Sequence, residues 1–325
     1  MLRVTVKSES AAAAGTSPTP ALLPAPGAVL ELLKPITWFP PMWAFGCGVV
    51  SAGVPLSGHT LTIVLGLLLA GPLVCASSQA VNDWFDRDVD AINEPHRPIP
   101  SGRIPGQWGL YIAIVWTALS LALAASLGPV VFAAGVVGLA LAWAYSAPPL
   151  RLKRNGWWGN AACGLCYEGL AWVTGAAVVL AGSMPDARVF ALAALYSFGA
   201  HGIMTLNDFK AIDGDRRMGV ASLPVQLGER GAARAACTMM ALPQFVVIAL
   251  LLAWQQPWHA VAVGALLAVQ LAMMTRFWRA PTAANALWFS AFGVNFFVIG
   301  MLISAFALRA ASSPATTATL PLGVG

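Results

Sequence analysis

Acidic residues are scarce in this 325-residue chain, and most of them lie in two short segments. The segment Asn82–Glu94 holds five of the 13 Asp and Glu residues, and the segment Asn207–Asp215 holds three more. Both segments begin with the pattern Asn-Asp-aromatic, which suggests a parallel internal repeat. The eight acidic residues are Asp83, Asp86, Asp88, Asp90, Glu94, Asp208, Asp213 and Asp215.

The spacing of these residues predicts a binding site for a divalent cation. If the preceding helix continues through the first segment, Asn82, Asp86 and Asp90 recur every fourth residue and share one face. In the second segment, Asp208 and Asp215 would share a helix face in the same way. Neighbouring carboxylates repel one another unless a cation lies between them. Mg²⁺ characteristically joins a few carboxylates to substrate phosphate oxygens, so we expect Mg²⁺ and a phosphate-bearing substrate here.

Basic residues could bind the remaining phosphate oxygens. Those interleaved with the acidic residues are Arg87, Arg97, Lys210 and Arg216. A third segment, Tyr145–Arg154, contains two consecutive prolines, which end a helix, and then three cations. It offers Tyr145, Ser146, Lys153 and Arg154 as further phosphate contacts, with a plain anchoring role at the membrane surface as the alternative.

Membrane-spanning helices must position these residues. The chain is 58% hydrophobic and only 10% charged, with a mean hydropathy of +0.73, whereas soluble domains are roughly 25% charged. This composition excludes a soluble globular domain and a nucleic-acid-binding module, so we expect no nucleic-acid partner. The five cysteines, among them the pair Cys163 and Cys166, lie in apolar stretches, which favours helix packing over disulfides.

Nine apolar stretches recur with about the 20 residues that a membrane span needs. All but two of the 18 Lys and Arg residues, Arg188 and Arg309, then fall on one side. The positive-inside rule makes that side and the N-terminus cytoplasmic and puts the C-terminus opposite. The predicted spans are Ile36–Val54, Thr60–Val81, Trp108–Ser126, Pro129–Tyr145, Gly159–Ala181, Val189–Leu206, Ala235–Trp254, His259–Thr275 and Leu287–Leu308.

The remaining residues are predicted to form tails and loops. Residues 1–28 are rich in Ala, Pro, Ser and Thr and are expected to form a disordered tail. Residues 29–309 form one all-α, nine-helix transmembrane domain, and residues 310–325 a mobile tail. Two long cytoplasmic loops, Asn82–Gln107 and Asn207–Gly231, carry the acidic segments, which favours a functional role for both.

Several of these segments resemble the intramembrane UbiA-type prenyltransferase superfamily. The resemblance covers roughly Val29 to Leu308 and rests first on the motif Asn-Asp-x-x-Asp-x-x-x-Asp at Asn82–Asp90, the Tyr-Ser-x-x-Pro-x-x-x-Lys segment from Tyr145 and the acidic motif at Asp208–Asp215. The continuation of the first motif is similar to the chlorophyll and bacteriochlorophyll synthase branch. So are the segments Leu33–Trp43, Asn155–Asn160 and His201–Lys210.

The resemblance implies transfer of a C20 prenyl group, geranylgeranyl or phytyl, from its diphosphate to the propionate carboxylate of bacteriochlorophyllide a. It implies a UbiA-like fold, Mg²⁺ as cofactor, and the lipid bilayer of the cell inner membrane or of an intracytoplasmic photosynthetic membrane. Association with other pigment-biosynthesis or light-harvesting proteins is an expectation of the same kind.

The expected roles follow the motifs. Asn82, Asp86 and Asp90 would hold one Mg²⁺, and Asp208 and Asp215, with Asp213 as an alternative, would hold another. Many relatives carry a further acid where this chain has Ala211, so the second ligand set stays open. His201, in the sixth predicted span, is expected to contact the tetrapyrrole or to bond within the bundle.

Two other functions remain as alternatives at this stage. The same fold could act on chlorophyllide or on a quinone-type aromatic acceptor. A cation-coupled transporter is the alternative of another class, but it would need acidic residues inside the spans, and Glu168 alone lies deep in one.

Overall fold

The computed structural model describes residues 23–312, which are almost entirely helical. This confirms the predicted all-α fold class. The predicted tails lie largely outside the described residues. The described residues extend slightly into both predicted tails and are helical there. Helix α1 (Pro26–Leu33) begins before residue 29, and the last helix, α14, continues to Ser312.

Eight helical stretches among residues 23–312 are long and apolar enough to cross a membrane. Proline occupies the first turn of several helices, where its missing N–H has no intrahelical partner to lose. Two stretches join shorter helices through π-helical turns, η2 (Leu69–Cys75) and η4 (Leu165–Leu170). The helices of the eight stretches are α3 (Thr60–Leu68), α4 (Ala76–Asn93), α5 (Trp108–Ser126), α6 (Pro129–Ser146), α7 (Gly156–Gly164), α8 (Ala171–Val179), α9 (Ala187–Asp208), α11 (Leu223–Ala253), α12 (Pro257–Arg279), α13 (Ala283–Phe292) and α14 (Val294–Ser312).

The predicted first span differs from the others. Helix α2 (Phe39–Ser51) has 13 residues, about 20 Å of rise, which is less than a bilayer core requires. It is short because Lys34 adopts a left-handed conformation (φ 47°) after α1, and the short helix η1 (Pro35–Thr37) intervenes. The count of nine full-length spans is therefore wrong for the described residues, which contain eight and this shorter ninth helix.

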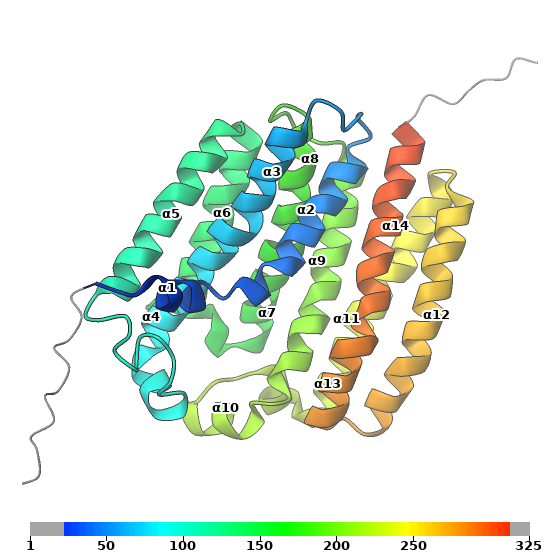
Figure 1. Ribbon diagram of the computed structural model, residues 1–325. Coiled ribbons are helices and arrows are strands. Elements are labelled where there is room, and N and C mark those ends of the chain that lie inside the picture. Colours follow the sequence, from blue (N-terminus) through cyan, green and yellow to red (C-terminus); the bar gives the residue numbers. More distant parts are fainter. Residues whose placement is uncertain (1–22, 313–325) are drawn as a thin grey trace, which may run out of the picture.

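The two predicted long loops are partly helical. Helix α4 continues to Asn93, so it includes the whole first acidic motif, as its four-residue spacing predicts. The second loop contains the short helix α10 (Ile212–Met218) and the first turns of α11. Helices α4 and α9 run in the same direction, and their C-terminal ends lie with α10 at one end of the bundle (Figure 1).

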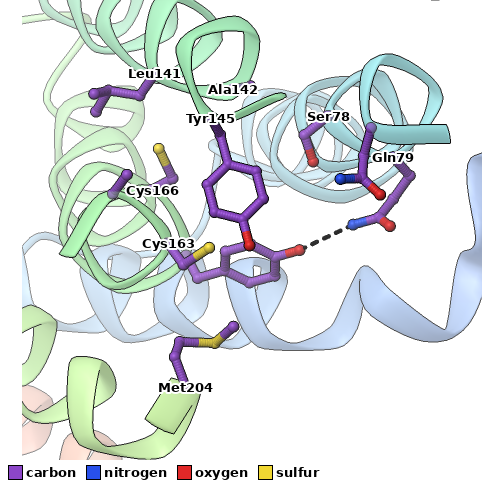
Figure 2. A pocket seen from close by; sticks show the side chains of 11 residues that line it. Ser78, Gln79, Leu141, Ala142, Tyr145, Cys163, Cys166 and Met204 are labelled. Carbon is purple, nitrogen blue, oxygen red and sulfur yellow. Dashed lines mark hydrogen bonds between the residues drawn. The ribbon is translucent and has the colours of Figure 1, made fainter. Parts of the chain in front are cut away.

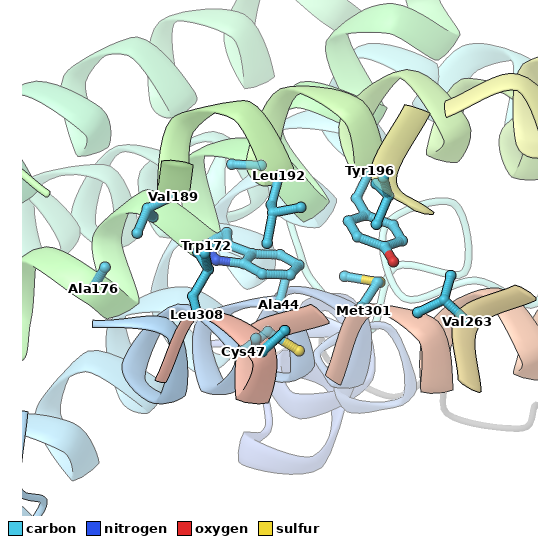
Figure 3. Packing of buried hydrophobic residues seen from close by; sticks show 14 of the residues in the cluster. Ala44, Cys47, Trp172, Ala176, Val189, Leu192, Tyr196, Val263, Met301 and Leu308 are labelled. Atoms are coloured by element: carbon cyan, nitrogen blue, oxygen red, sulfur yellow. The ribbon is translucent and has the colours of Figure 1, made fainter. Parts of the chain in front are cut away.

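Small residues and aromatic rings hold the centre of the bundle together. Helices α2, α8, α9 and α14 contribute to a buried cluster in which Trp172 stacks on Tyr196, with ring centroids 5.6 Å apart (Figure 3). Tyr196 and Phe297 pack edge to face, with ring centroids 5.1 Å apart. The Tyr196 hydroxyl bonds to Ser304 at 2.8 Å, so its polar end is satisfied. Because lipid tails are as apolar as the side chains, such close packing, rather than the hydrophobic effect, drives association of these helices.

Candidate active site

The first acidic motif contacts the predicted cationic segment. Asp86 of α4 accepts hydrogen bonds from Lys153 Nζ at 2.5 Å to each carboxylate oxygen. Lys153 belongs to the short helix η3 (Leu152–Arg154), which follows α6. Four residues before Asp86, the Asn82 amide donates to the Ser146 hydroxyl at 3.2 Å. The C-terminal parts of α4 and α6 therefore bring together side chains that are far apart in the sequence, namely Asn82, Asp86, Ser146 and Lys153.

Arg97 joins the other acids of this motif. Its guanidinium donates to Asp90 at 2.9 Å and to Glu94 at 2.5 Å, and lies 3.5 Å from Asp83. Asp83 is buried and also accepts a 2.6 Å bond from Lys34, at the end of α1. Asp83 therefore links α1 and Arg97 to α4, Asp90 shares Arg97 with it, and Asp86 is paired with Lys153 instead.

The second motif departs from the predicted shared helix face. Helix α9 ends at Asp208, and a turn precedes α10, so Asp208 and Asp215 lie on different helices. The chain turns there because Phe209 packs into the bundle against Phe277, with ring centroids 5.1 Å apart. Asp208 accepts a bond from the Asn160 amide at 3.2 Å, and Asp215 accepts one from the Ser222 hydroxyl at 2.6 Å.

Backbone pairing connects the cationic segment to the second motif. Gly156 N–H donates to the Ala221 carbonyl, and Ala221 N–H donates to the Arg154 carbonyl, both at 2.8 Å. The side chain of Ser222, the next residue, holds Asp215. Gly156 allows this close contact because a Cβ there would lie 2.6 Å from the backbone nitrogen of Leu223. These hydrogen bonds thus hold the segment that carries Lys153 in a fixed position relative to Asp215.

Two adjoining cavities lie beside the first residues of the two acidic segments. One, of about 190 Å³, is lined by Asn82 and Tyr145, and the other, of about 300 Å³, extends to Asn207. Both are bordered by Cys163, Tyr167 and Met204. Figure 2 shows Tyr145, Cys163 and Met204 around the same space, with the Gln79 amide bonded to the Tyr167 hydroxyl at 3.2 Å.

Burial and pairing shift the pKa values of several groups around the site. Burial lowers the pKa of the Lys153 ammonium, against the opposing effect of Asp86. Burial likewise raises the pKa of the Asp215 carboxyl, although the Ser222 hydrogen bond works the other way. The Arg97 hydrogen bond lowers the pKa of Glu94. Two of these three groups are therefore held in surroundings less polar than water.

Several predicted site residues lie elsewhere. The Arg87 guanidinium stacks 4.3 Å from the Trp84 ring centre, at the surface. Arg154 is exposed, and His201 Nε2 bonds to the Trp157 carbonyl at 3.1 Å. Three other predicted residues line a separate surface pocket with Glu229, and neither Asp208 nor Asp215 is among its lining residues. The three residues are Lys210, Asp213 and Arg216.

Sequence reasoning missed four residues that contact the site. Asn160 and Ser222 hold the second motif's carboxylates, and Gln79 and Tyr167 form a hydrogen bond at the cavity wall. Gln79 could have been found, because it precedes Asn82 by three residues on the same helix face. The others come from distant segments, and no local spacing relates them to the motifs.

The arrangement fits Mg²⁺ through its donor chemistry. Among residues 23–312, no three His, Cys, Asp or Glu side chains form a group that could hold a metal ion by itself. Mg²⁺, however, usually keeps several waters and takes one or two carboxylates together with substrate phosphate oxygens. Asp86 and Asp90 at one motif, and Asp208 and Asp215 at the other, supply that number of oxygen ligands. The site therefore suits a cation that binds together with a diphosphate.

Comparison with known proteins identifies the relatives of this chain. The model of the UbiA prenyltransferase family matches residues 37–298. The bacteriochlorophyll synthase 33 kDa chain of Cereibacter sphaeroides is 56% identical over 290 residues, which are 89% of this chain and 95% of that protein. Chlorophyll synthase of Avena sativa is 38% identical, over 86% of this chain and 75% of that protein.

Solved structures share the fold. A UbiA homologue from Archaeoglobus fulgidus, bound to GPP and Mg²⁺, superposes with a TM-score of 0.67. The match covers 87% of this chain and 99% of that one, at 22% sequence identity. The predicted prenyltransferase architecture is therefore confirmed.

Proposed function

The chain belongs to the UbiA prenyltransferase family, and we propose that it transfers a C20 prenyl group, geranylgeranyl or phytyl, from its diphosphate to the propionate carboxylate of bacteriochlorophyllide a. Its identity of 56% to a bacteriochlorophyll synthase, against 38% to a chlorophyll synthase, supports this acceptor over chlorophyllide. The observation that carries the proposal is that Asn82 and Asn207, the first residues of the two acidic segments, line adjoining, largely apolar cavities within a membrane bundle.

The diphosphate would bind at the cytoplasmic end of these cavities. We assign Asn82, Asp86 and Asp90 to one Mg²⁺ site, and Asp208 and Asp215 to the other. Lys153 and Arg97 contact these carboxylates and are the cations best placed to reach the diphosphate. Tyr145 and Ser146, which border the same region, would supply hydroxyl donors.

The reaction breaks the bond between the prenyl C1 and its diphosphate oxygen and forms a bond from C1 to a carboxylate oxygen. Bound Mg²⁺ would supply Lewis-acid stabilisation of the leaving diphosphate. Lys153 and Arg97 add fixed positive charge where negative charge develops. No general base is required, because a carboxyl with a pKa near 4 is already ionised at neutral pH. The products are the prenyl ester and pyrophosphate.

The cavity lining would protect the reaction from water. Leu141, Ala142 and Met204 present apolar surface to the first cavity. A smaller apolar cavity of about 40 Å³ adjoins it at Cys166 and is bordered by Leu69 and Val131. These surfaces suit a hydrocarbon chain, and exclusion of water protects an allylic cation from hydrolysis. A transporter forms no allylic cation and would not need this protection from water.

The membrane orientation belongs to this proposal as well. We place the motif-bearing end in the cytoplasm, in the inner or intracytoplasmic photosynthetic membrane, with the C-terminus opposite. The cations Arg97, Arg103, Arg151 and Lys153 lie at that end, which supports the assignment through the positive-inside rule.

The test uses membranes from cells that express this chain and make no pigment of their own. Bacteriochlorophyllide a or chlorophyllide a is supplied with geranylgeranyl or phytyl diphosphate, with Mg²⁺ or with EDTA, and esterified pigment is separated by chromatography. We expect Mg²⁺-dependent esterification of bacteriochlorophyllide with release of pyrophosphate, reversed by EDTA and restored by added Mg²⁺. Folded protein that esterifies neither tetrapyrrole would contradict the proposal.

A further inference from the structure

An acidic side chain lies inside the membrane bundle without any assigned role. Glu168 belongs to the π-helical turn η4, between α7 and α8, and is 7% exposed. Its Oε2 atom is buried and has no hydrogen-bond partner among residues 23–312. Buried polar groups are almost always paired, so this orphaned oxygen requires an explanation. π-helical turns within α-helices occur frequently at functional sites.

Glu168 also lines the larger cavity of the candidate active site. The wall of this 300 Å³ cavity includes Glu168 and Ala200, and further along α9 it reaches Asn207. Ala200 precedes Asn207 by seven residues, which corresponds to about 10 Å along the helix. Glu168 therefore faces a space that extends along α9 to Asn207, at the start of the second acidic segment.

The surroundings of the Glu168 carboxyl determine whether its charged or its neutral form is stable. No ion pair to Glu168 occurs in the described part of the chain. An unpaired carboxylate inside a membrane is costly, so the group is stable there as the neutral acid. A neutral carboxyl carries one O–H, which makes it a hydrogen-bond donor to a carbonyl.

The proposed substrates differ in what they could offer such a donor. A prenyl chain is a hydrocarbon and has no acceptor atom, while its diphosphate is expected at the acidic motifs. The tetrapyrrole carries carbonyl groups on its rim in addition to the propionate that reacts. We propose that the Glu168 carboxyl donates a hydrogen bond to a rim carbonyl of the prenyl acceptor and so selects and orients it. This inference rests on the proposed function.

A structural role is the competing explanation. Ser197 Oγ is also buried without a partner among residues 23–312, and it lies on α9 against Gly169, the residue after Glu168. A Glu168 side chain that served only to bond Ser197 would stabilise the bundle without recognising any ligand. The variant Ser197→Ala is therefore the matched control.

The experiment measures binding of bacteriochlorophyllide a to the full chain in lipid nanodiscs. Glu168→Leu should weaken acceptor binding about tenfold, because one hydrogen bond to a buried polar group is lost. Glu168→Gln, which keeps an N–H donor, should restore most of the affinity. The KM for the prenyl diphosphate should stay unchanged in both variants. The carbonyl stretching frequency of the bound acceptor, measured by resonance Raman, should rise in Glu168→Leu.

An acceptor whose rim carbonyl is reduced to a methylene group completes the test. Wild-type protein should bind it about tenfold more weakly than bacteriochlorophyllide, and Glu168→Leu should bind both equally. Equal losses in Ser197→Ala, or an unchanged carbonyl frequency in Glu168→Leu, would overturn the inference. If wild-type protein forms no ester at all, the proposed function fails instead, so the two failures can be told apart.

Discussion

Asp86 and Asp88 lie two residues apart on α4, but one side chain is partly buried and the other is exposed. The Asp86 side chain is 24% exposed and bonds to Lys153, whereas that of Asp88 is 85% exposed and lies 3.7 Å from the Arg87 guanidinium. Helical geometry turns Asp88 away from the face that carries Asn82 and Asp86. The same residue type thus has a proposed ligand role at one position and a solvated role at the other.

This contrast gives a matched pair of substitutions. Asp86→Asn should reduce Mg²⁺-dependent turnover by about 10²–10³-fold, because it removes a charged ligand from a site of electrostatic stabilisation. Asp88→Asn should leave turnover within about twofold of wild type, since exposed ion pairs contribute little. Initial rates over a range of Mg²⁺ concentrations measure both. Near-normal turnover in a folded Asp86→Asn protein would refute the metal assignment.

Lys153 and Arg154 form a second matched pair. Lys153 is mostly buried on Asp86, and Arg154 is exposed. Lys153→Gln should raise the KM for the prenyl diphosphate about tenfold or more, because a charge-assisted hydrogen bond contributes roughly 1.5–3 kcal/mol. Arg154→Gln should change this KM by less than about twofold. Steady-state kinetics at saturating acceptor compare them, and equal effects would show that Lys153 has no special role.

At the scale of elements, regular spacing was predictable and chain reversals were not. The four-residue spacing of Asn82, Asp86 and Asp90 predicts one helix, which α4 confirms. Asp208 and Asp215 have a helix-compatible spacing too, but the packing of Phe209 against Phe277 ends α9 between them. That contact joins segments far apart in sequence, so no local pattern encodes it. Asn160 and Ser222 escaped prediction for the same reason.

The pairing of α2 with α8 gives a prediction about helix packing. A Cβ on Gly48 would overlap the Trp172 carbonyl oxygen, whereas one on Gly46 would meet no atom within 4 Å. Gly48→Ala should therefore lower the free energy of unfolding by about 1–3 kcal/mol, the usual effect of overpacking. Gly46→Ala, in the same helix, should leave it nearly unchanged. Thermal unfolding of the purified proteins in detergent would measure the difference, and equal melting temperatures would contradict the packing argument.

At the scale of the whole molecule, the question of whether α2 crosses the membrane decides on which sides the two termini lie. Eight crossings would put both termini on one side of the membrane, and nine would put them on opposite sides. Helix α2 is short, but it packs beside α8 and α14 in the buried cluster, and its end at Ser51 accepts a hydrogen bond from Trp172. In Figure 1, α14 ends at the pole opposite the motif-bearing ends of α4 and α9. This arrangement favours nine crossings despite the length of α2.

Reporter fusions test this threading directly. A cytoplasm-active fluorescent reporter fused after residue 325 should stay dark, while a periplasm-active phosphatase at the same place should be active. The phosphatase fused after Asn93, at the end of α4, should be inactive, because the positive-inside rule makes that end cytoplasmic. All eight full-length spans lie after Val54, so the N-terminus is the end whose side depends on α2, and a cytoplasm-active fluorescent reporter fused before residue 1 should be bright if α2 crosses. A dark N-terminal reporter, with the phosphatase after Asn93 still inactive, would mean that α2 does not cross and that the bundle has eight crossings.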